Sequence, residues 1–463
     1  MSDRKAQLTD GPVGRILLSM TGPMIVGMFA LVAFNLADAF FVAQLGTPQL
    51  AAMSFTFPVV MFLGSIAIGL GIGTASVLSR AIGRGDTMRV RRIATDSLAL
   101  AFLVVLVCSF FGMLTIDPLF RLLGAGPDLL PFIRDYMIIW YSGMAFLVVP
   151  MVGNNAIRAT GDTRTPSVIM VIAALLNVAL DPILIFGLFG MPRLEMAGAA
   201  LATVITRALT LVLALAVLHF REGLLDLRRP HWKEVWASWR EVLFIAIPAG
   251  STNLLTPVSQ AVITRIMAGF GPAVVAGFGA GTRVEAFAFL VIIALAISLT
   301  PFVGQNWGAN RPDRVRRALW LGAGFAIVWG GISWVAFLAT GKTIAVWFGD
   351  KPELRRTLVQ YLWIIALTYG LQGVCHLASA TLNAMNRPFL AAAVIIIRTF
   401  VFVVPLAYVG AQLLGVHGAF VGIAVGNVVA GIAALAIVWR TLGHPVPSDA
   451  PAATEECPSF PAP

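Results

Sequence analysis

Long apolar runs dominate the chain, and short polar connections separate them. A helix needs about 20 residues to cross the ~30 Å hydrocarbon core of a bilayer. Twelve runs reach that length, near residues 16–43, 50–78, 93–115, 132–156, 166–189, 196–219, 242–269, 275–302, 318–340, 358–380, 389–412 and 418–439. The runs are continuous and do not alternate with a period of two, which favours helices over a barrel. The pattern predicts an all-α integral membrane protein with twelve transmembrane helices.

The two halves of the chain repeat one another at a shift of 225 residues. Gly83 aligns with Gly308, and the run Arg-Val-Arg-Arg at 89–92 recurs at 314–317. Each copy holds six apolar runs, so both copies enter the membrane in the same direction and are expected to be related by an axis along the membrane normal. The repeat predicts two six-helix lobes that face one another across a cavity.

The connections set the predicted boundaries. The units are an amino-terminal lobe at 1–220, a cytoplasmic linker at 221–241, a carboxy-terminal lobe at 242–442 and a tail at 443–463. In the linker, Trp232, Trp236 and Trp239 would line one face of a short amphipathic helix on the membrane surface, or form an ordinary interfacial aromatic belt. The tail is rich in Pro and Ala without apolar periodicity, which predicts disorder.

Composition and charge agree with a membrane protein. The chain is 59% hydrophobic and 12% charged, whereas soluble domains carry about 25% charged residues. Of the basic residues counted at the amino terminus and on the connections, twenty-one lie on the side of the amino terminus and six on the opposite side. The positive-inside rule places both termini in the cytoplasm, so we expect a multi-pass protein of the cell inner (plasma) membrane. Anionic lipids explain the net charge of +10, and no aromatic-interleaved basic patch indicates nucleic acid. We expect a monomer that binds small-molecule substrates.

Two acidic residues interrupt the apolar runs of the first half. Asp38 lies in the first run, three residues after Asn35. Asn177 and Asp181 lie four residues apart in the fifth run, so they share one face of that helix. An ionised carboxylate at the bilayer centre costs about 2.5–3.5 kcal/mol on insertion scales. Each acid is therefore expected to be protonated, paired, or exposed to a water-filled cavity.

Three interpretations of these acids are open. If Asp38 and Asp181 face one another, loss of water and mutual repulsion favour their protonated forms, and the pair is a proton switch. With Asn177 and the Thr203 hydroxyl, the acids also form an oxygen set that suits a sodium ion. Alternatively, a neighbouring amide or arginine neutralises each acid, and Arg207 in the sixth run is a candidate partner of Asp181.

Further polar residues lie within the apolar runs. Arg283 and Glu285 are two residues apart, so they point to different sides of their helix and each needs another partner. Arg265 and Arg398 are expected on faces that line a cavity, where they would meet anionic groups. Tyr136 in the fourth run is expected to line a cavity or to lie at the membrane interface.

No constellation typical of catalysis or metal binding is evident. The three cysteines and five histidines are scattered without ligand spacing, so no disulfide, metal cluster or cofactor is expected. The glycines of 69–73 lie inside an apolar run and follow no strand, so they predict a helix-packing face rather than a nucleotide loop. We expect a transporter driven by an ion gradient, H⁺ or Na⁺, and not an enzyme.

Several motifs occur together along the chain. They are Asn35-Leu36-Ala37-Asp38, Gly83-Arg84-Gly85-Asp86, Arg158-Ala159-Thr160-Gly161-Asp162, Asn177 with Asp181-Pro182, Gly198-Ala199-Ala200, and Val303-Gly304-Gln305-Asn306-Trp307-Gly308-Ala309. Together they resemble the multidrug and toxic compound extrusion (MATE) family over nearly the whole chain. One branch of that family has acids in the seventh and tenth helices, where this chain offers Gln260 and Gln372. The chain is therefore more similar to the DinF-type branch, which argues against a sodium site in the carboxy-terminal lobe.

The resemblance implies two six-helix lobes, alternating access, and export of amphipathic, often cationic compounds in exchange for H⁺ or Na⁺. It places the cation-coupling site at Asp38, Tyr136, Asn177, Asp181 and Thr203. The substrate cavity is implied to adjoin this site and Asn35. A bend of the first helix at Pro23 is implied to release the substrate.

These expectations combine into a cation-coupled antiporter, in which H⁺ or Na⁺ at Asp38 and Asp181 displaces an amphipathic cationic solute. The alternative is a flippase for lipid-linked intermediates, built on a related duplicated scaffold. In that case Arg265, Arg283 and Arg398 would line the cavity and bind phosphate.

Overall fold

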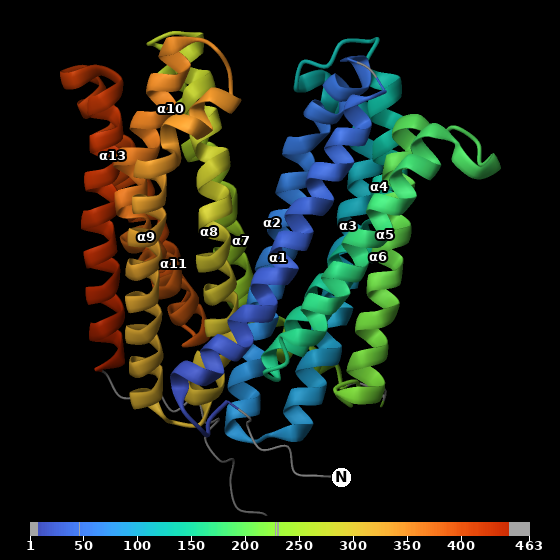
Figure 1. Ribbon diagram of the computed structural model, residues 1–463. Helices are drawn as coiled ribbons and strands as arrows, with labels where there is room; N and C mark the ends of the chain where they lie inside the picture. Colours follow the sequence, from blue (N-terminus) through green and yellow to red (C-terminus); the bar gives the residue numbers. More distant parts are fainter. Residues whose placement is uncertain (1–7, 46, 227, 229–230, 444–463) are drawn as a thin grey trace, which may run out of the picture.

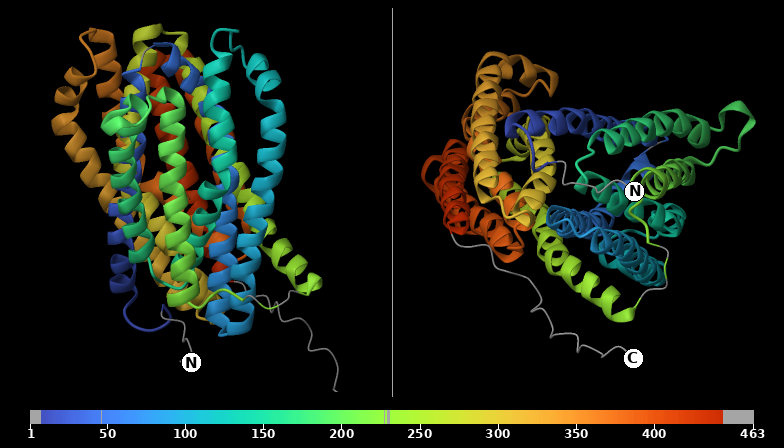
Figure 2. Two further views of the ribbon diagram at one scale, coloured as in Figure 1. Left: turned by 90° about the vertical axis from the view of Figure 1, so that its right-hand side faces the viewer. Right: turned by 90° about the horizontal axis from the view of Figure 1, so that it is seen from below.

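Two bundles of long helices make up the molecule (Figure 1). The computed structural model describes residues 8–45, 47–226, 228 and 231–443, and no strand occurs among them. In Figure 1 the bundles converge at the end where the described chain begins and spread apart toward the other end. The described chain also finishes at the converging end, after its last helix. Seen from this end, the two bundles lie side by side (Figure 2). This end is called the N-terminal face below.

Six spans form the amino-terminal lobe. They are α1 (Val13–Ala43), α2 (Thr47–Arg84), α3 (Thr87–Leu122), α4 (Leu130–Ala159), α5 (Arg164–Phe186) with the 3₁₀ turn η1 (Leu188–Gly190), and α6 (Glu195–Ala216), which continues into the π-helical turn η2 (Val217–Arg221). The carboxy-terminal lobe holds α7 (Trp232–Ala268), α8 (Pro272–Gly308), α9 (Pro312–Trp347), α10 (Pro352–Ile365), the 3₁₀ turn η3 (Ala366–Thr368), α11 (Tyr369–Ala384), α12 (Pro388–Ile396), the π-helical turn η4 (Ile397–Val403) and α13 (Val404–Leu442).

Proline marks the start of several helices in the carboxy-terminal lobe. Pro272, Pro312, Pro352 and Pro388 occupy the first position of α8, α9, α10 and α12. Amides in the first turn have no partner within the helix, so the missing N–H of proline costs nothing there. These prolines therefore fix the helix boundaries.

Eleven helical stretches in the described chain are long and apolar enough to cross a membrane, and the last one accounts for two spans. That stretch runs from Pro388 to Leu442, 55 residues in all, and its backbone leaves the helical region at Leu414 and Gly415. Beyond this break the chain doubles back, because a Cβ on Gly422 would meet the backbone of Leu406. The predicted all-α fold with twelve spans in two lobes is confirmed.

The contact between the lobes has two-fold symmetry. On α2, Gly83 packs against the backbone of Gln305, and on α8, Gly308 packs against the backbone of Arg80. The repeat shift of 225 residues relates Arg80 to Gln305 and Gly83 to Gly308. Each helix therefore offers the other the same two positions, as expected for an axis along the membrane normal.

The glycine run at 69–73 packs helices closely, as predicted. A Cβ on Gly69 would lie 3.0 Å from the Cα of Gly250, and one on Gly73 would lie 2.6 Å from the carbonyl oxygen of Val242. Both partners lie on α7. Small residues thus let α2 and α7 approach across the lobe boundary.

The predicted linker at 221–241 is only partly a separate element. α7 begins at Trp232, so the second half of the linker forms the first turns of a long helix instead of a separate short one. Trp232 and Trp236 are exposed, whereas Trp239 is partly buried and its Nε1 donates to the Asp96 carbonyl oxygen at 2.9 Å. Trp239 therefore packs this helix against α3. The predicted disordered tail at 443–463 lies, except for its first residue, outside the described residues.

Candidate functional site

The predicted cation site in the amino-terminal lobe depends on α1 and α5, which pack against each other closely. A Cβ on Gly27 of α1 would lie 3.1 Å from the Cα of Ser167 on α5. Both helices run away from the N-terminal face (Figure 1). Asp38 follows Gly27 by eleven residues and Asn177 follows Ser167 by ten, which correspond to rises of about 16 and 15 Å. The two polar side chains therefore lie at the same depth.

Asn177 and Asp181 form a buried pair on α5. Both residues are 0% exposed, and Asn177 Nδ2 donates to Asp181 Oδ1 at 3.2 Å. Three other oxygens of this group are buried without a hydrogen bond: Asp38 Oδ1, Asn177 Oδ1 and Asp181 Oδ2. A buried acceptor without a donor costs about 1–3 kcal/mol. The two carboxylates can recover that free energy by taking up a proton, and all three oxygens are of the kind that binds a small cation.

Tyr136 joins the two acids from α4. Its side chain is buried, and the carboxylates of Asp38 and Asp181 both act electrostatically on its hydroxyl. The two carboxylates also interact with each other. The structure therefore brings together Asp38, Tyr136, Asn177 and Asp181, four of the predicted site residues.

The position of Thr203 follows from a contact that Arg207 makes, one helical turn away on α6. The guanidinium carbon of Arg207 lies 5.0 Å from the centre of the Phe34 ring. Because α6 runs opposite to α1, one turn back from Arg207 corresponds to one turn forward from Phe34. Thr203 is thus level with Asp38 and is half-buried. Arg207 and Asp181 form no ion pair, so the interpretation that Arg207 neutralises this acid is wrong.

Asn35 and Pro23 lie on α1 with Asp38. Asn35 is exposed, and the structure shows no hydrogen bond from its side chain to the described residues. Pro23 lies inside α1, fifteen residues before Asp38, and the helix continues through it from Val13 to Ala43. The helical hydrogen-bond pattern of α1 is thus continuous on both sides of Pro23.

The carboxy-terminal lobe holds a polar network that the sequence analysis missed. Glu285 on α8 accepts hydrogen bonds from the Tyr361 hydroxyl and, at 3.0 Å, from Gln372 Nε2. Arg398 Nε, on η4, donates to Asn427 Oδ1 at 3.0 Å, and Arg398 interacts electrostatically with Glu285. The partners that Glu285 needs are thus found on α10 and α11, and Arg398 is bonded to α13. Arg265 and Arg283 are exposed and form no ion pair with any described residue.

A buried hydroxyl on α6, that of Thr206, was not predicted from the sequence. Thr206 is 0% exposed and its Oγ1 has no hydrogen-bond partner among the described residues. It lies three residues after Thr203, on the same side of α6. The sequence could have indicated this hydroxyl, because Thr206 follows Thr203 at helical spacing within the same apolar run.

The motif at 303–309 closes the N-terminal face. Gln305 Nε2 donates to the Ala159 carbonyl oxygen at 2.8 Å, and Gln305 Oε1 accepts from the Leu8 amide at 3.1 Å. Asn306 Nδ2 donates to the Leu8 carbonyl oxygen at 3.1 Å. Residues of the carboxy-terminal lobe therefore hold the first described residue, Leu8, and the end of α4.

Comparison with known proteins agrees with this architecture. A family model described as MatE matches residues 23–183 and 248–409, two segments whose starts are separated by the shift of the internal repeat. The chain belongs to the MatE family. Members of the MatE family are membrane transporters, not enzymes, and coupling to ions is general among them. The prediction of an integral membrane transporter of this family is confirmed.

Individual MatE relatives cover nearly the whole chain. A protein of Shewanella oneidensis named FAD transporter is 39% identical over 95% of this chain and 97% of its own. A Bacillus subtilis protein named probable multidrug resistance protein YoeA is 26% identical over 79% of this chain and 80% of its own. The Vibrio cholerae MATE transporter VcmN in the bent form superposes with a TM-score of 0.89 at 30% identity, over 93% of this chain and 97% of that one.

Proposed function

We propose that the protein is an antiporter that exports organic solutes in exchange for H⁺ or Na⁺ bound at Asp38 and Asp181. The observation that carries the proposal is the set of buried, unpaired oxygens on these two acids and Asn177. A proton on either carboxylate removes a buried charge, and a sodium ion would be held by oxygens from all three side chains together with Thr203.

Competition for one site couples the two flows. A cationic solute that is held by the ionised carboxylates loses that interaction when a proton or Na⁺ neutralises Asp38 and Asp181. Tyr136 would orient the two carboxylates, because it is buried beside both. Exchange therefore requires only that the site open alternately to the two sides of the membrane.

We also propose that the N-terminal face lies in the cytoplasm of the cell inner membrane. The excess of basic residues on that side supports this orientation. The lobes meet at this face through Gly83 and Gly308, so the conformation described here would be closed to the cytoplasm.

Two classes of solute are candidates. Amphipathic cations follow from the resemblance to multidrug exporters, and the names of YoeA and of the Staphylococcus multidrug export proteins MepA support them. A flavin dinucleotide is the second candidate, because the relative named FAD transporter is 39% identical, against 26% for YoeA. The flippase alternative has less support, because Arg398 is bound to Asn427 rather than free in a cavity.

Transport by the purified protein in liposomes tests the proposal. The internal solution would contain FAD or a fluorescent organic cation, and a pH gradient or a sodium gradient would be imposed in separate runs. We expect one gradient to drive transport of at least one solute, and Asp38→Asn to abolish it. Asp350→Asn removes an exposed acid on the opposite face and should leave transport intact. If transport continues at the same rate after both ion gradients are collapsed, the proposal is overturned.

A further inference from the structure

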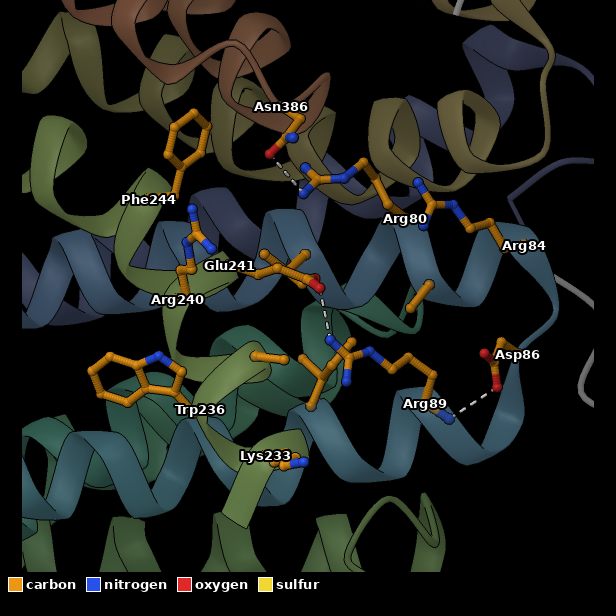
Figure 3. Close-up of a pocket in the computed structure, with 14 residues that line it drawn as sticks. Arg80, Arg84, Asp86, Arg89, Lys233, Trp236, Arg240, Glu241, Phe244 and Asn386 are labelled. Carbon is orange, nitrogen blue, oxygen red and sulfur yellow. Dashed lines mark hydrogen bonds and ion pairs between the residues drawn. The ribbon is translucent and has the colours of Figure 1, made fainter. Parts of the chain in front are cut away.

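A cavity of about 640 Å³ opens on the N-terminal face between the lobes (Figure 3). Its walls come from α2 and α3 of the amino-terminal lobe, from α7, and from Asn386 in the segment that joins α11 to α12. The size is typical of cavities that bind small molecules. This cavity is called the inter-lobe pocket below, and it is separate from the acids of the amino-terminal lobe.

The inter-lobe pocket is strongly cationic. Five basic side chains and two carboxylates line it. Both carboxylates are already occupied: Glu241 pairs with Arg89 at 2.7 Å, and Asp86 caps α3 by accepting from the Arg89 amide at 2.9 Å. Lys233 and Arg240 are exposed and pair with no carboxylate in the described part of the chain. The pocket therefore keeps an excess of positive charge that an anion would neutralise.

One face of α7 supplies both charge and aromatic surface to the pocket. Lys233, Trp236, Arg240 and Phe244 recur at intervals of three or four residues, so they form one stripe of the helix. Trp236 and Phe244 are 59% and 44% exposed. Figure 3 shows the Trp236 ring and the guanidinium of Arg240 on the same side of the pocket. An occupant with a phosphate beside an apolar or aromatic group fits this arrangement.

Bonds between the lobes surround the pocket. Arg80 on α2 donates to the Ala384 carbonyl oxygen and to Asn386 Oδ1, each at 3.0 Å. The Arg89 and Glu241 pair joins α3 to α7. Basic groups from both sides of the boundary thus face one space in this closed conformation. An anion that contacts both sides binds the closed state more tightly and so favours it.

We propose that the inter-lobe pocket binds a phosphate-bearing anion and that this anion holds the N-terminal face closed. The shared chemistry is a phosphate group next to an apolar moiety, which either an anionic lipid headgroup or a free nucleotide supplies. The proposal is independent of the transported solute, because binding and closure are measured without transport.

Hydrogen exchange of the full-length protein in nanodiscs measures closure directly. The segments to follow are 84–88 and 385–388, which lie on opposite sides of the pocket and separate when the face opens. In one arm, inorganic pyrophosphate is added to phosphatidylcholine nanodiscs. In the other arm, phosphatidylglycerol replaces part of the phosphatidylcholine and no pyrophosphate is added. We expect exchange to slow at least about fivefold in one arm, and the arm that responds identifies the source of the phosphate.

A pair of double variants shows whether the pocket is responsible. Lys233→Gln with Arg240→Gln should remove most of the response, and both side chains are exposed, so folding is preserved. Lys351→Gln with Arg356→Gln removes the same charge from the opposite face and should respond as the wild type does. The proposal is overturned if neither anion slows exchange, or if the pocket variant responds as strongly as the wild type.

Discussion

Gly308 packs against the backbone of Arg80 across the lobe boundary. A methyl group at Gly308 would lie 3.0 Å from the Arg80 carbonyl carbon and would overlap its oxygen. Gly308→Ala is therefore expected to destabilise the closed N-terminal face by about 1–3 kcal/mol. Hydrogen exchange at 84–88 should become faster. Gly324→Ala on α9 is the matched control, because a Cβ there meets nothing within 4 Å. Equal exchange in both variants would show that this contact does not hold the face closed.

Asp38→Asn should uncouple transport without harming the fold. The substitution keeps the shape of the side chain and removes a charge whose Oδ1 has no hydrogen-bond donor. We expect gradient-driven transport to fall to the level of empty liposomes, with an unchanged melting temperature or a higher one. Transport by liposomes and thermal unfolding of the same preparation provide the two measurements. Full transport by the variant would remove Asp38 from the mechanism.

Asn177→Leu should destabilise the protein in a pH-dependent manner. The amide of Asn177 is the hydrogen-bond donor to Asp181, so its loss leaves both carboxylate oxygens unpaired. The expected cost is about 1–3 kcal/mol while the acid is charged, and it should shrink as the pH falls and the acid becomes neutral. Melting temperatures across the pH range measure this. In an Asp181→Asn background the same substitution should lose its pH dependence, and a dependence that persists there would place the titrating group elsewhere.

Glu285 and Arg398 should stabilise the carboxy-terminal lobe as a unit. Glu285→Leu leaves the Arg398 charge without its electrostatic partner, at an expected cost of about 3 kcal/mol. Adding Arg398→Met should cost less than the sum of the single changes, with a coupling of about 1 kcal/mol or more. Denaturation of the two single variants and the double variant supplies the cycle. Arg283→Met, at an exposed site without an ion pair, should change stability by less than about 0.5 kcal/mol. Strict additivity would contradict the coupling.

The spans were predictable because a continuous apolar run of membrane length admits only a helix. The repeat also predicted the symmetry that Gly83 and Gly308 display, since equal shifts in sequence put equivalent helices on either side of one axis. The break at Leu414 and Gly415 separates spans that the sequence had already divided at the same place. The internal repeat and the lengths of the apolar runs were sufficient to predict each of these features.

Partners distant in sequence could not be predicted. Glu285 finds its hydrogen-bond donors 76 and 87 residues away, on helices whose rotation about their axes no local pattern fixes. Arg207 was a reasonable partner for Asp181 by proximity of their helices, but its guanidinium packs on Phe34 instead. By contrast, the bond between Asn177 and Asp181 was foreseeable, because a spacing of four brings side chains together within one helix.

α1 begins in one lobe and ends in the other. Leu17 and Met20 belong to a core made mostly of residues from the carboxy-terminal lobe, and Leu8 is fastened there by Gln305 and Asn306. Twenty-one residues after Leu17, the same helix presents Asp38 to Tyr136 and Asp181. A helix of 31 residues is about 46 Å long, and Pro23, which lacks the N–H for one helical hydrogen bond, separates its two ends. Movement at the Asp38 end therefore reaches the anchored end only through Pro23, so the stiffness of the helix at this residue decides how strongly occupancy of the acids is felt at the opposite face of the protein.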